Sequence, residues 1–280
     1  ILVDWNPAEE QMTAYHATQA PHMIQTVLAE HLGLPEGRVR VICEDVGGSY
    51  GIKVHVYPDE VATAAIAKIM GRPVKFVADR LESFTSDIHA RDHEIVAKIA
   101  VQEDGTIVAM DVDDWTAIGA YSVYPRTSAI EGNQVVNLCG GPYDFKHYRA
   151  KTTVVFQNKT PTCQYRAVGH PIAVAITEGL VDMAAAEIGM DPVEIRRRNL
   201  FRDDAYPATS PANMRFEGLS HHASLNKLLE LMDYDGLRAE QAELRRQSSA
   251  LVARPRTPRV DAPSGSQRSA SRAASSRRPH

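Results

Sequence analysis

The sequence predicts a mixed fold, α+β or α/β, and three observations support this prediction. Apolar residues recur at helical spacing in several segments, of which 171–188 is the longest. Segments 93–101 and 106–115 have strand-like patterns and flank a turn-forming Glu-Asp-Gly, which is typical of a hairpin. Helical and strand-like segments intermix along the chain, so both parallel and antiparallel pairing are expected.

Local periodicity and stop signals predict the elements of the first part of the chain. Met23, Val27 and Leu28 share one face of a helix that Gly33 ends, and Gly71 ends an alanine-rich helix. The expected elements are strand residues 1–16, a helix over 21–32, a strand over 38–44, a glycine segment over 45–53, a helix over 59–70 and a buried strand over 74–78.

The second part continues with helices and one further strand. Asp191 and Pro192 are the residue types preferred at a helix N-cap and first position, so a helix begins there. Segment 119–141 is rich in turn residues and receives no element. The expected elements after the hairpin are a strand over 149–157, a helix over 171–188, a helix from 191 to 199 and a helix over 225–246.

Composition limits the classes of function. The chain has 280 residues, 44% of them hydrophobic, which suits a globular protein in the cytoplasm, with the periplasm as the alternative. No apolar stretch reaches the ~18 residues of a membrane span. Residues 248–280 contain seven arginines and one acid, a charge of +6, so the rest of the chain carries −10. An acidic body argues against a nucleic-acid partner, because the phosphate backbone repels negative charge. The three cysteines form no C-x-x-C pair, so an iron–sulfur cluster would belong to another chain.

The glycine segment is the first candidate for chemistry. Gly47, Gly48 and Gly51 follow a predicted strand, and glycines there let backbone N–H groups approach an anionic ligand. The spacing matches neither the dinucleotide-binding nor the P-loop motif, so a purely structural turn is the favoured alternative when the segment is considered alone.

Two other segments contain residues suited to ligands. His89 and His93 are four positions apart, but Ala90 replaces the glutamate of zinc proteases, and the strand pattern separates the two rings. Arg166 lies in the turn 165–171 before a long helix, where a guanidinium suits an anionic or carbonyl ligand. A helix-entry turn with a surface arginine is the alternative.

Taken in order, these segments resemble the molybdopterin-binding subunit of xanthine-dehydrogenase family hydroxylases over about residues 1–246. The segments that carry the resemblance are 18–22, 33–36, 45–53, 71–74, 79–82, 141–143, 165–171 and 191–200. The resemblance implies the first half of that family's molybdopterin-binding domain. It also implies that Gln19 bonds an oxygen of the molybdenum centre, that Tyr50 with Gly47, Gly48 and Gly51 lies against the metal and pterin, and that Arg166 contacts the cofactor.

Departures from the family pattern concern the substrate. Val54 stands where purine-oxidising members have a glutamate, and Gln134 where they have an arginine. Ala167 stands where copper-containing carbon monoxide dehydrogenases have a cysteine. The resemblance therefore implies hydroxylation of an aldehyde or N-heteroaromatic carbon. It places four residues in the substrate pocket: Val54, Gln134, Val168 and His170. The alternative role for His170 is to cap the following helix.

The resemblance also implies cofactors and partners. Molybdopterin, or its cytosine dinucleotide form, would bind this chain. An iron–sulfur small subunit and an FAD medium subunit would accept the electrons. The full-length parent would be a dimer of heterotrimers. The family's general-base glutamate comes from the second half of the subunit, so a chain limited to 1–246 is expected to be inactive alone. Residues 247–280 are expected to be a disordered basic tail, with out-of-frame translation as its source.

Two other interpretations stay open. One is a phosphate- or nucleotide-binding module that uses the Gly47–Gly51 turn, with Arg166 as a phosphate clamp. The other is a non-functional gene fragment whose folded part has lost its ligand. Separately, a first residue, Ile1, that is not methionine leads us to expect a sequence that begins within a longer reading frame.

Overall fold

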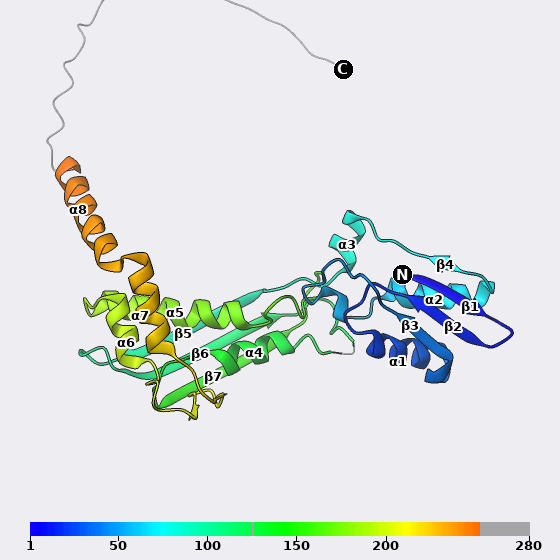
Figure 1. The fold of residues 1–280 in the computed structure, drawn as a ribbon, viewed down its shortest axis with the longest axis horizontal. Coiled ribbons are helices and arrows are strands. Elements are labelled where there is room, and N and C mark those ends of the chain that lie inside the picture. The colour runs from blue at the N-terminus through cyan, green and yellow to red at the C-terminus, as the bar shows by residue number, and fades with distance from the viewer. Residues whose placement is uncertain (125, 253–280) are drawn as a thin grey trace, which may run out of the picture. The chain divides into compact units, whose positions relative to one another are not determined.

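The computed structural model describes residues 1–124 and 126–252, and the chain divides into two compact units, 1–225 and 226–280 (Figure 1). Helices and strands intermix in the first unit, which confirms the predicted mixed fold. No helix among the described residues combines the length and apolar character of a membrane span.

The first layer is a four-stranded sheet in the order β3-β2-β1-β4, with α1 and α2 packed on one face. β1 and β2 are antiparallel, β3 is parallel to β2, and β4 is antiparallel to β1. The core contains Val3, Met12, Leu28 and Ala64, each fully buried. The elements are β1 (Leu2–Asn6), β2 (Gln11–Tyr15), α1 (Pro21–Leu32), β3 (Val39–Ile42), α2 (Pro58–Met70) and β4 (Val74–Lys75).

Two strand predictions in this layer are wrong in detail. Residues 1–16 form a hairpin instead of one strand, because the Asn6 side chain accepts hydrogen bonds from the N–H groups of Ala8 and Glu9 and turns the chain. The predicted buried strand 74–78 is a two-residue edge strand, and Val77 beyond it is 70% exposed.

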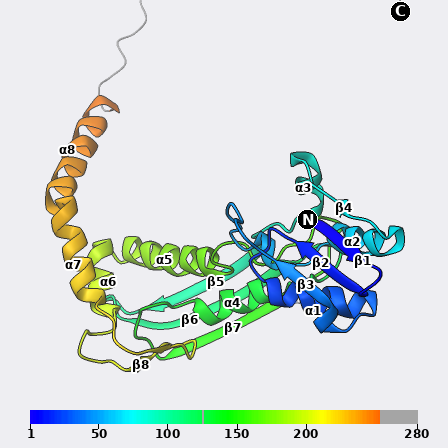
Figure 2. The same cartoon turned by 45° about the vertical axis from the view of Figure 1, so that its right-hand side comes forward.

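The second layer is a three-stranded sheet, with α4 and α5 on one face and α6 against α5 (Figures 1 and 2). β5 and β6 form the predicted antiparallel hairpin, and β7 lies parallel to β6. α4 lies in the segment to which the sequence assigned no element. The elements are β5 (His93–Val101), β6 (Ile107–Ala117), α4 (Ile130–Leu138), β7 (His147–Val155), α5 (His170–Glu187) and α6 (Pro192–Asn199).

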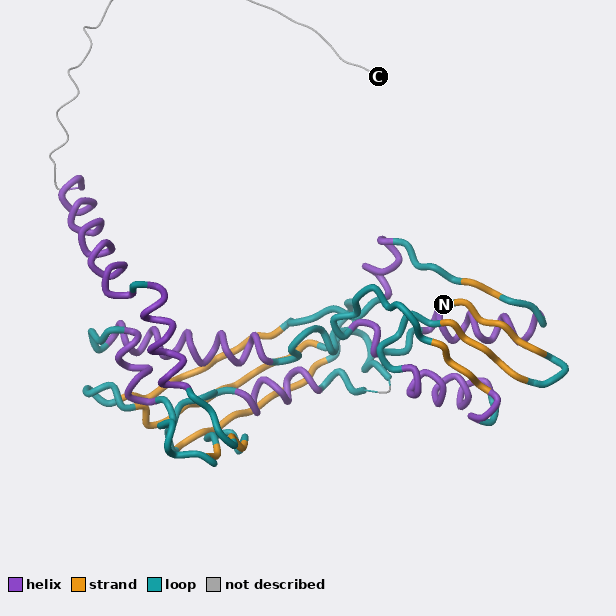
Figure 3. Tube along the Cα trace, in the orientation of Figure 1, coloured by secondary structure: helices purple, strands orange, loops and turns teal. Residues whose placement is uncertain are grey.

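Short elements and loops complete the described chain, and Figure 3 distinguishes them from the helices and strands of the two layers. Asp79 caps α3 (Arg80–Ser86), and β8 (Ala208–Thr209) pairs with β9 (Arg215–Phe216). The single helix predicted over 225–246 is wrong. Asp233 adopts a left-handed backbone (φ 49°) and separates α7 (His221–Met232) from α8 (Tyr234–Val252). The predicted disordered tail starts at 247, but α8 continues to Val252; the rest of the tail, from 253 onward, lies outside the described residues.

Candidate functional site

The glycine segment forms a turn that only a glycine-rich sequence adopts readily. Gly47, Gly48 and Gly51 have φ of +69°, +95° and +100°, and Tyr50 between them also has a positive φ. A side chain added at Gly47 would meet no atom within 4 Å, and one at Gly48 would meet only the Tyr50 ring. The backbone at these two glycines is therefore accessible to a ligand.

Gln19 is attached to this turn through its backbone and its side chain. Its N–H donates to the carbonyl of Lys53 at 3.1 Å, and its Oε1 accepts from the N–H of Gly51 at 3.2 Å. Thr18 Oγ1 also donates to the Lys53 carbonyl, at 3.0 Å. The carbonyl half of the Gln19 amide is thus used by the protein, which orients the NH₂ half of an exposed side chain as a donor.

Arg166 contacts the same turn from a segment much later in the sequence. Its N–H donates to the Tyr50 carbonyl at 2.7 Å, and its guanidinium carbon lies 5.7 Å from the centre of the Tyr50 ring. A Cβ at Gly51 would lie 2.5 Å from the Gln164 carbonyl oxygen, so this approach requires glycine. The structure therefore brings Gln19, Tyr50 and Arg166 together, although more than 100 positions separate the last two.

A small core supports the turn from behind. Tyr57 Oη donates to the Ile52 carbonyl at 2.8 Å, and Tyr57 packs with Ile88 and Cys163. His55 is 1% exposed with no hydrogen-bond partner for either ring nitrogen. Burial lowers the pKa of His55 to about 4, the nearby Gln164 backbone opposes this in part and Arg126 adds to it, so the ring is neutral at pH 7.

The four residues expected in the substrate pocket are less closely grouped. Val54 is buried, and its N–H donates to the Gly51 carbonyl. Gln134 of α4 lies against Gly169: a Cβ added at Gly169 would be 2.5 Å from the Cβ of Gln134. Val168 is half-buried, whereas His170 is exposed at the start of α5 with Nδ1 3.0 Å from the Val168 carbonyl.

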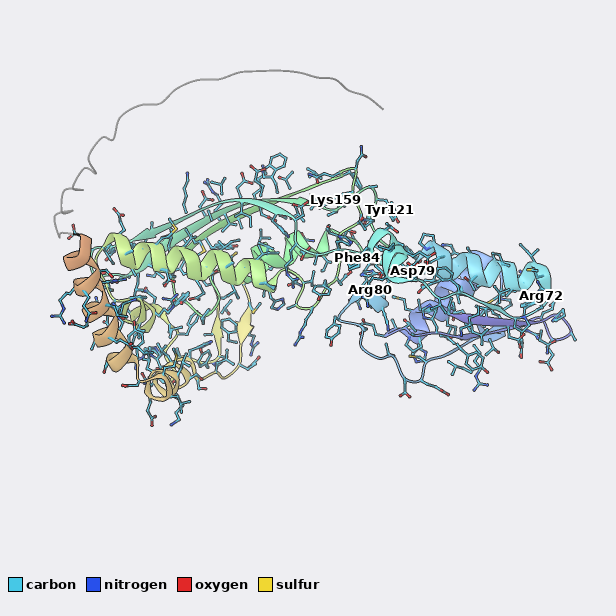
Figure 4. The ribbon with its side chains drawn as sticks, turned by 90° about the horizontal axis from the view of Figure 1, so that it is seen from above. Arg72, Asp79, Arg80, Phe84, Tyr121 and Lys159 are labelled. Atoms are coloured by element: carbon cyan, nitrogen blue, oxygen red, sulfur yellow. The ribbon has the colours of Figure 1, made fainter. Side chains whose placement is uncertain are left out.

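A cavity of about 430 Å³ opens beside the Arg166 turn, and the sequence did not indicate it. It is lined by positively charged and aromatic side chains, among which Arg91 lies 5.3 Å from the ring centre of Tyr165. Arg80 and Phe84 of α3 line the cavity too, whereas Arg72 lies at the far end of α2 (Figure 4). Burial and the nearby Asp59 raise the pKa of Asp87, the cavity's acidic residue.

This arrangement has the chemistry of an anion-binding cradle. Accessible backbone at two glycines, an oriented amide and a guanidinium held over an aromatic ring supply hydrogen-bond donors and one positive charge. These donors fit a large anionic cofactor that carries oxygen atoms.

Comparison with known proteins shows close relatives. The family model described as molybdopterin cofactor-binding domain matches residues 1–200. The chain is 32% identical over 249 residues to the carbon monoxide dehydrogenase large chain of Hydrogenophaga pseudoflava. This match covers 87% of the present chain and 30% of the relative. It is 31% identical over 251 residues to the nicotine 6-hydroxylase large subunit of Paenarthrobacter nicotinovorans, with 89% and 30% covered.

A solved structure gives the same result. The chain superposes on quinoline 2-oxidoreductase from Pseudomonas putida 86 with a TM-score of 0.84 and 30% identity, over 88% of this chain and 31% of that one. The chain therefore spans about 30% of the length of these relatives.

Proposed function

Because this chain belongs to the molybdopterin cofactor-binding domain family, we propose that it forms part of the large subunit of a molybdenum hydroxylase. One observation carries the proposal: Gln19, the glycine turn and Arg166, far apart in sequence, meet in one hydrogen-bonded cradle. We propose that residues 1–246 form a partial cofactor-binding domain and that residues 247–280, which begin within α8, are a tail outside it.

Each residue of the cradle has a distinct binding role. The Gln19 NH₂ group and the backbone at Gly47 and Gly48 donate hydrogen bonds to cofactor oxygens, and the Arg166 guanidinium neutralises negative charge. The Tyr50 ring lies against both the guanidinium and Gly48 and offers an aromatic face to the cofactor. The cofactor, molybdopterin or its cytosine dinucleotide form, supplies the redox chemistry that hydroxylates a carbon atom.

The proposed substrate is an aldehyde or an N-heteroaromatic ring. Two relatives act, by their names, on nicotine and quinoline, which are N-heteroaromatic compounds. Val54 and Gln134 are uncharged side chains, so they offer no ion pair for holding an ionised purine. Ala167 offers no thiol ligand for copper, which argues against oxidation of carbon monoxide of the copper-dependent type.

The complete enzyme would contain more than this chain. We propose an iron–sulfur small subunit and an FAD medium subunit as electron acceptors, in a dimer of heterotrimers in the cytoplasm. The relatives are named as large chains or large subunits, which supports such partners. We place the general-base glutamate in the part of the large subunit that lies beyond the matched 30%, so this chain alone would bind cofactor without turnover.

Metal and pterin analysis tests the cradle. The 280-residue chain would be produced in a bacterium that makes molybdopterin, and molybdenum and released pterin would be counted per purified chain. We expect both in the wild type, and at least a tenfold reduction in Arg166→Ala. Arg72→Ala removes an exposed guanidinium outside the cradle and should bind as the wild type does.

Two results would overturn the proposal. A wild-type chain that copurifies with neither molybdenum nor pterin has no cofactor-binding role of its own. A bound nucleotide or phosphate without molybdenum would support the phosphate-binding alternative, which the comparisons do not favour.

A further inference from the structure

A cluster of three ionisable side chains lies buried beneath the Arg166 turn. His93 of β5, Asp114 of β6 and Glu131 of α4 have side chains that are 3%, 0% and 0% exposed. His93 Nδ1 lies 2.8 Å from Asp114 Oδ1, and His93 Nε2 lies 3.9 Å from Glu131 Oε2. In the described part of the chain, no group of three or more His, Cys, Asp or Glu side chains is arranged to hold a metal ion. The cluster therefore needs another explanation.

The surroundings fix this cluster in place. Thr116 and Thr152 donate to Asp114 Oδ2 at 2.7 and 2.9 Å. A Cβ at Gly132 would lie 2.5 Å from Thr152 Oγ1 and 2.6 Å from Thr116 Oγ1, so α4 approaches the sheet as closely as glycine permits. Burying three ionisable groups carries a large desolvation cost, and apolar side chains of similar volume would avoid it.

The cluster is connected to the Arg166 turn at two points. The N–H of Arg91 donates to Glu131 Oε2 at 3.2 Å, and the Arg91 guanidinium donates to the Arg166 carbonyl. Arg91 adopts a left-handed backbone (φ +63°), a strained conformation that these bonds hold. At the second point, a Cβ on Gly169 would lie 2.9 Å from the Glu131 carbonyl oxygen.

We propose that Glu131, with His93 and Asp114, is a positioning residue that acts through Arg91 to hold the Arg166 turn against Tyr50. The link to a cofactor rests on the proposed function, but the positioning itself is a property of this chain. Arg166 contributes more binding energy when its turn is already fixed before the ligand arrives, because less ordering remains to be done on binding. A buried polar cluster specifies one arrangement where an apolar core would tolerate several.

The protonation state of His93 agrees with this role. Burial by itself lowers the pKa of His93, but Asp114 and Glu131 outweigh it and raise the pKa to about 9. Asp114 on β6 and Glu131 on α4 are the ionisable side chains that face the ring. At neutral pH the His93 ring is therefore an imidazolium that donates from Nδ1 to Asp114, with Glu131 Oε2 3.9 Å from its other nitrogen.

The test uses two variants of the 280-residue chain without cofactor. Glu131→Gln removes one carboxylate from the cluster, and Arg91→Ala removes the connection to Arg166 while leaving the cluster intact. Two quantities are measured by NMR: the pKa of the His93 ring, and the protection from hydrogen exchange of the Arg166 amide, which bonds the Tyr50 carbonyl.

We expect Glu131→Gln to lower the pKa of His93 by at least one unit. The same variant should reduce the protection of the Arg166 amide from hydrogen exchange at least tenfold. Arg91→Ala should lower the same protection but leave the His93 pKa unchanged. Glu178→Gln is the matched control, because Glu178 accepts bonds from Tyr143 and Arg196 in the same unit. It should change neither quantity beyond its effect on global unfolding.

Unchanged Arg166 protection in Arg91→Ala would overturn the proposal, even if Glu131→Gln failed to fold. So would a Glu178→Gln control that lowers the protection as much as Glu131→Gln does. Absence of molybdenum in the wild type would instead defeat the proposed function and leave these two measurements valid.

Discussion

Replacing Gly51 by alanine tests the close approach on which the cradle depends. A Cβ at Gly51 would lie 2.5 Å from the Gln164 carbonyl oxygen, and ordinary contact begins at 3.4 Å, so the two segments must separate by about 0.9 Å. Such overpacking costs ~1–3 kcal/mol. The positive φ costs a further ~1–2 kcal/mol for any residue with a Cβ. Loss of the Arg166–Tyr50 hydrogen bond adds ~1 kcal/mol. We therefore expect Gly51→Ala to lower the free energy of unfolding by about 3–6 kcal/mol.

Gly47→Ala is the control within the same turn. Its φ is also positive, but the new Cβ would meet no atom within 4 Å, so only the backbone cost of ~1–2 kcal/mol applies. Urea denaturation followed by circular dichroism measures both variants against the wild type. Equal losses in the two variants would refute the reasoning, because the contact with Gln164 would then have no measurable effect.

Three further predictions concern the rest of the first unit. His93 has a folded pKa of about 9 against an ordinary 6.5, which corresponds to about 3 kcal/mol of the free energy of unfolding. This stabilisation is complete below pH 6.5 and is lost as pH rises through 9. Urea titrations at a series of pH values should show the fall in the wild type and not in His93→Gln. Asn199→Ala leaves the buried N–H of Ile107 without its acceptor and should cost ~1–3 kcal/mol, measured by urea denaturation; a loss near zero would contradict the role of this bond. Asp191→Ala removes the acceptor of the Val193 N–H at the start of α6 and should cost ~1 kcal/mol, visible as a lower melting temperature.

The sequence predicted the regular elements well because their signals are local. Helix α1 has its apolar residues on one face and a glycine directly after its last turn, and both are read within 13 residues. The β5–β6 hairpin is indicated by two strand-like segments and one turn. Errors occurred where a single residue redirects the chain, as Asn6 does after β1 and Asp233 does between α7 and α8.

The sequence also determined the family, and the comparisons confirmed it. The roles assigned to Gln19, Tyr50 and Arg166 came from the resemblance and stay predictions, but the structure brings all three to one turn. They could be singled out from one chain because the motifs that contain them appear in the order of the family's pattern, which requires no knowledge of what they contact.

The tertiary structure decided which residues support that turn. Arg91 and Glu131 are 40 positions apart and Arg91 and Arg166 are 75 apart, so no local pattern links them. In the sequence His93 belongs to a strand pattern and Glu131 to a turn-rich segment, and neither suggests burial. Only the packing of α4 on the sheet removes water from both and brings a carboxylate within 4 Å of the imidazole ring, because the charge of a buried group is governed by its neighbours in space.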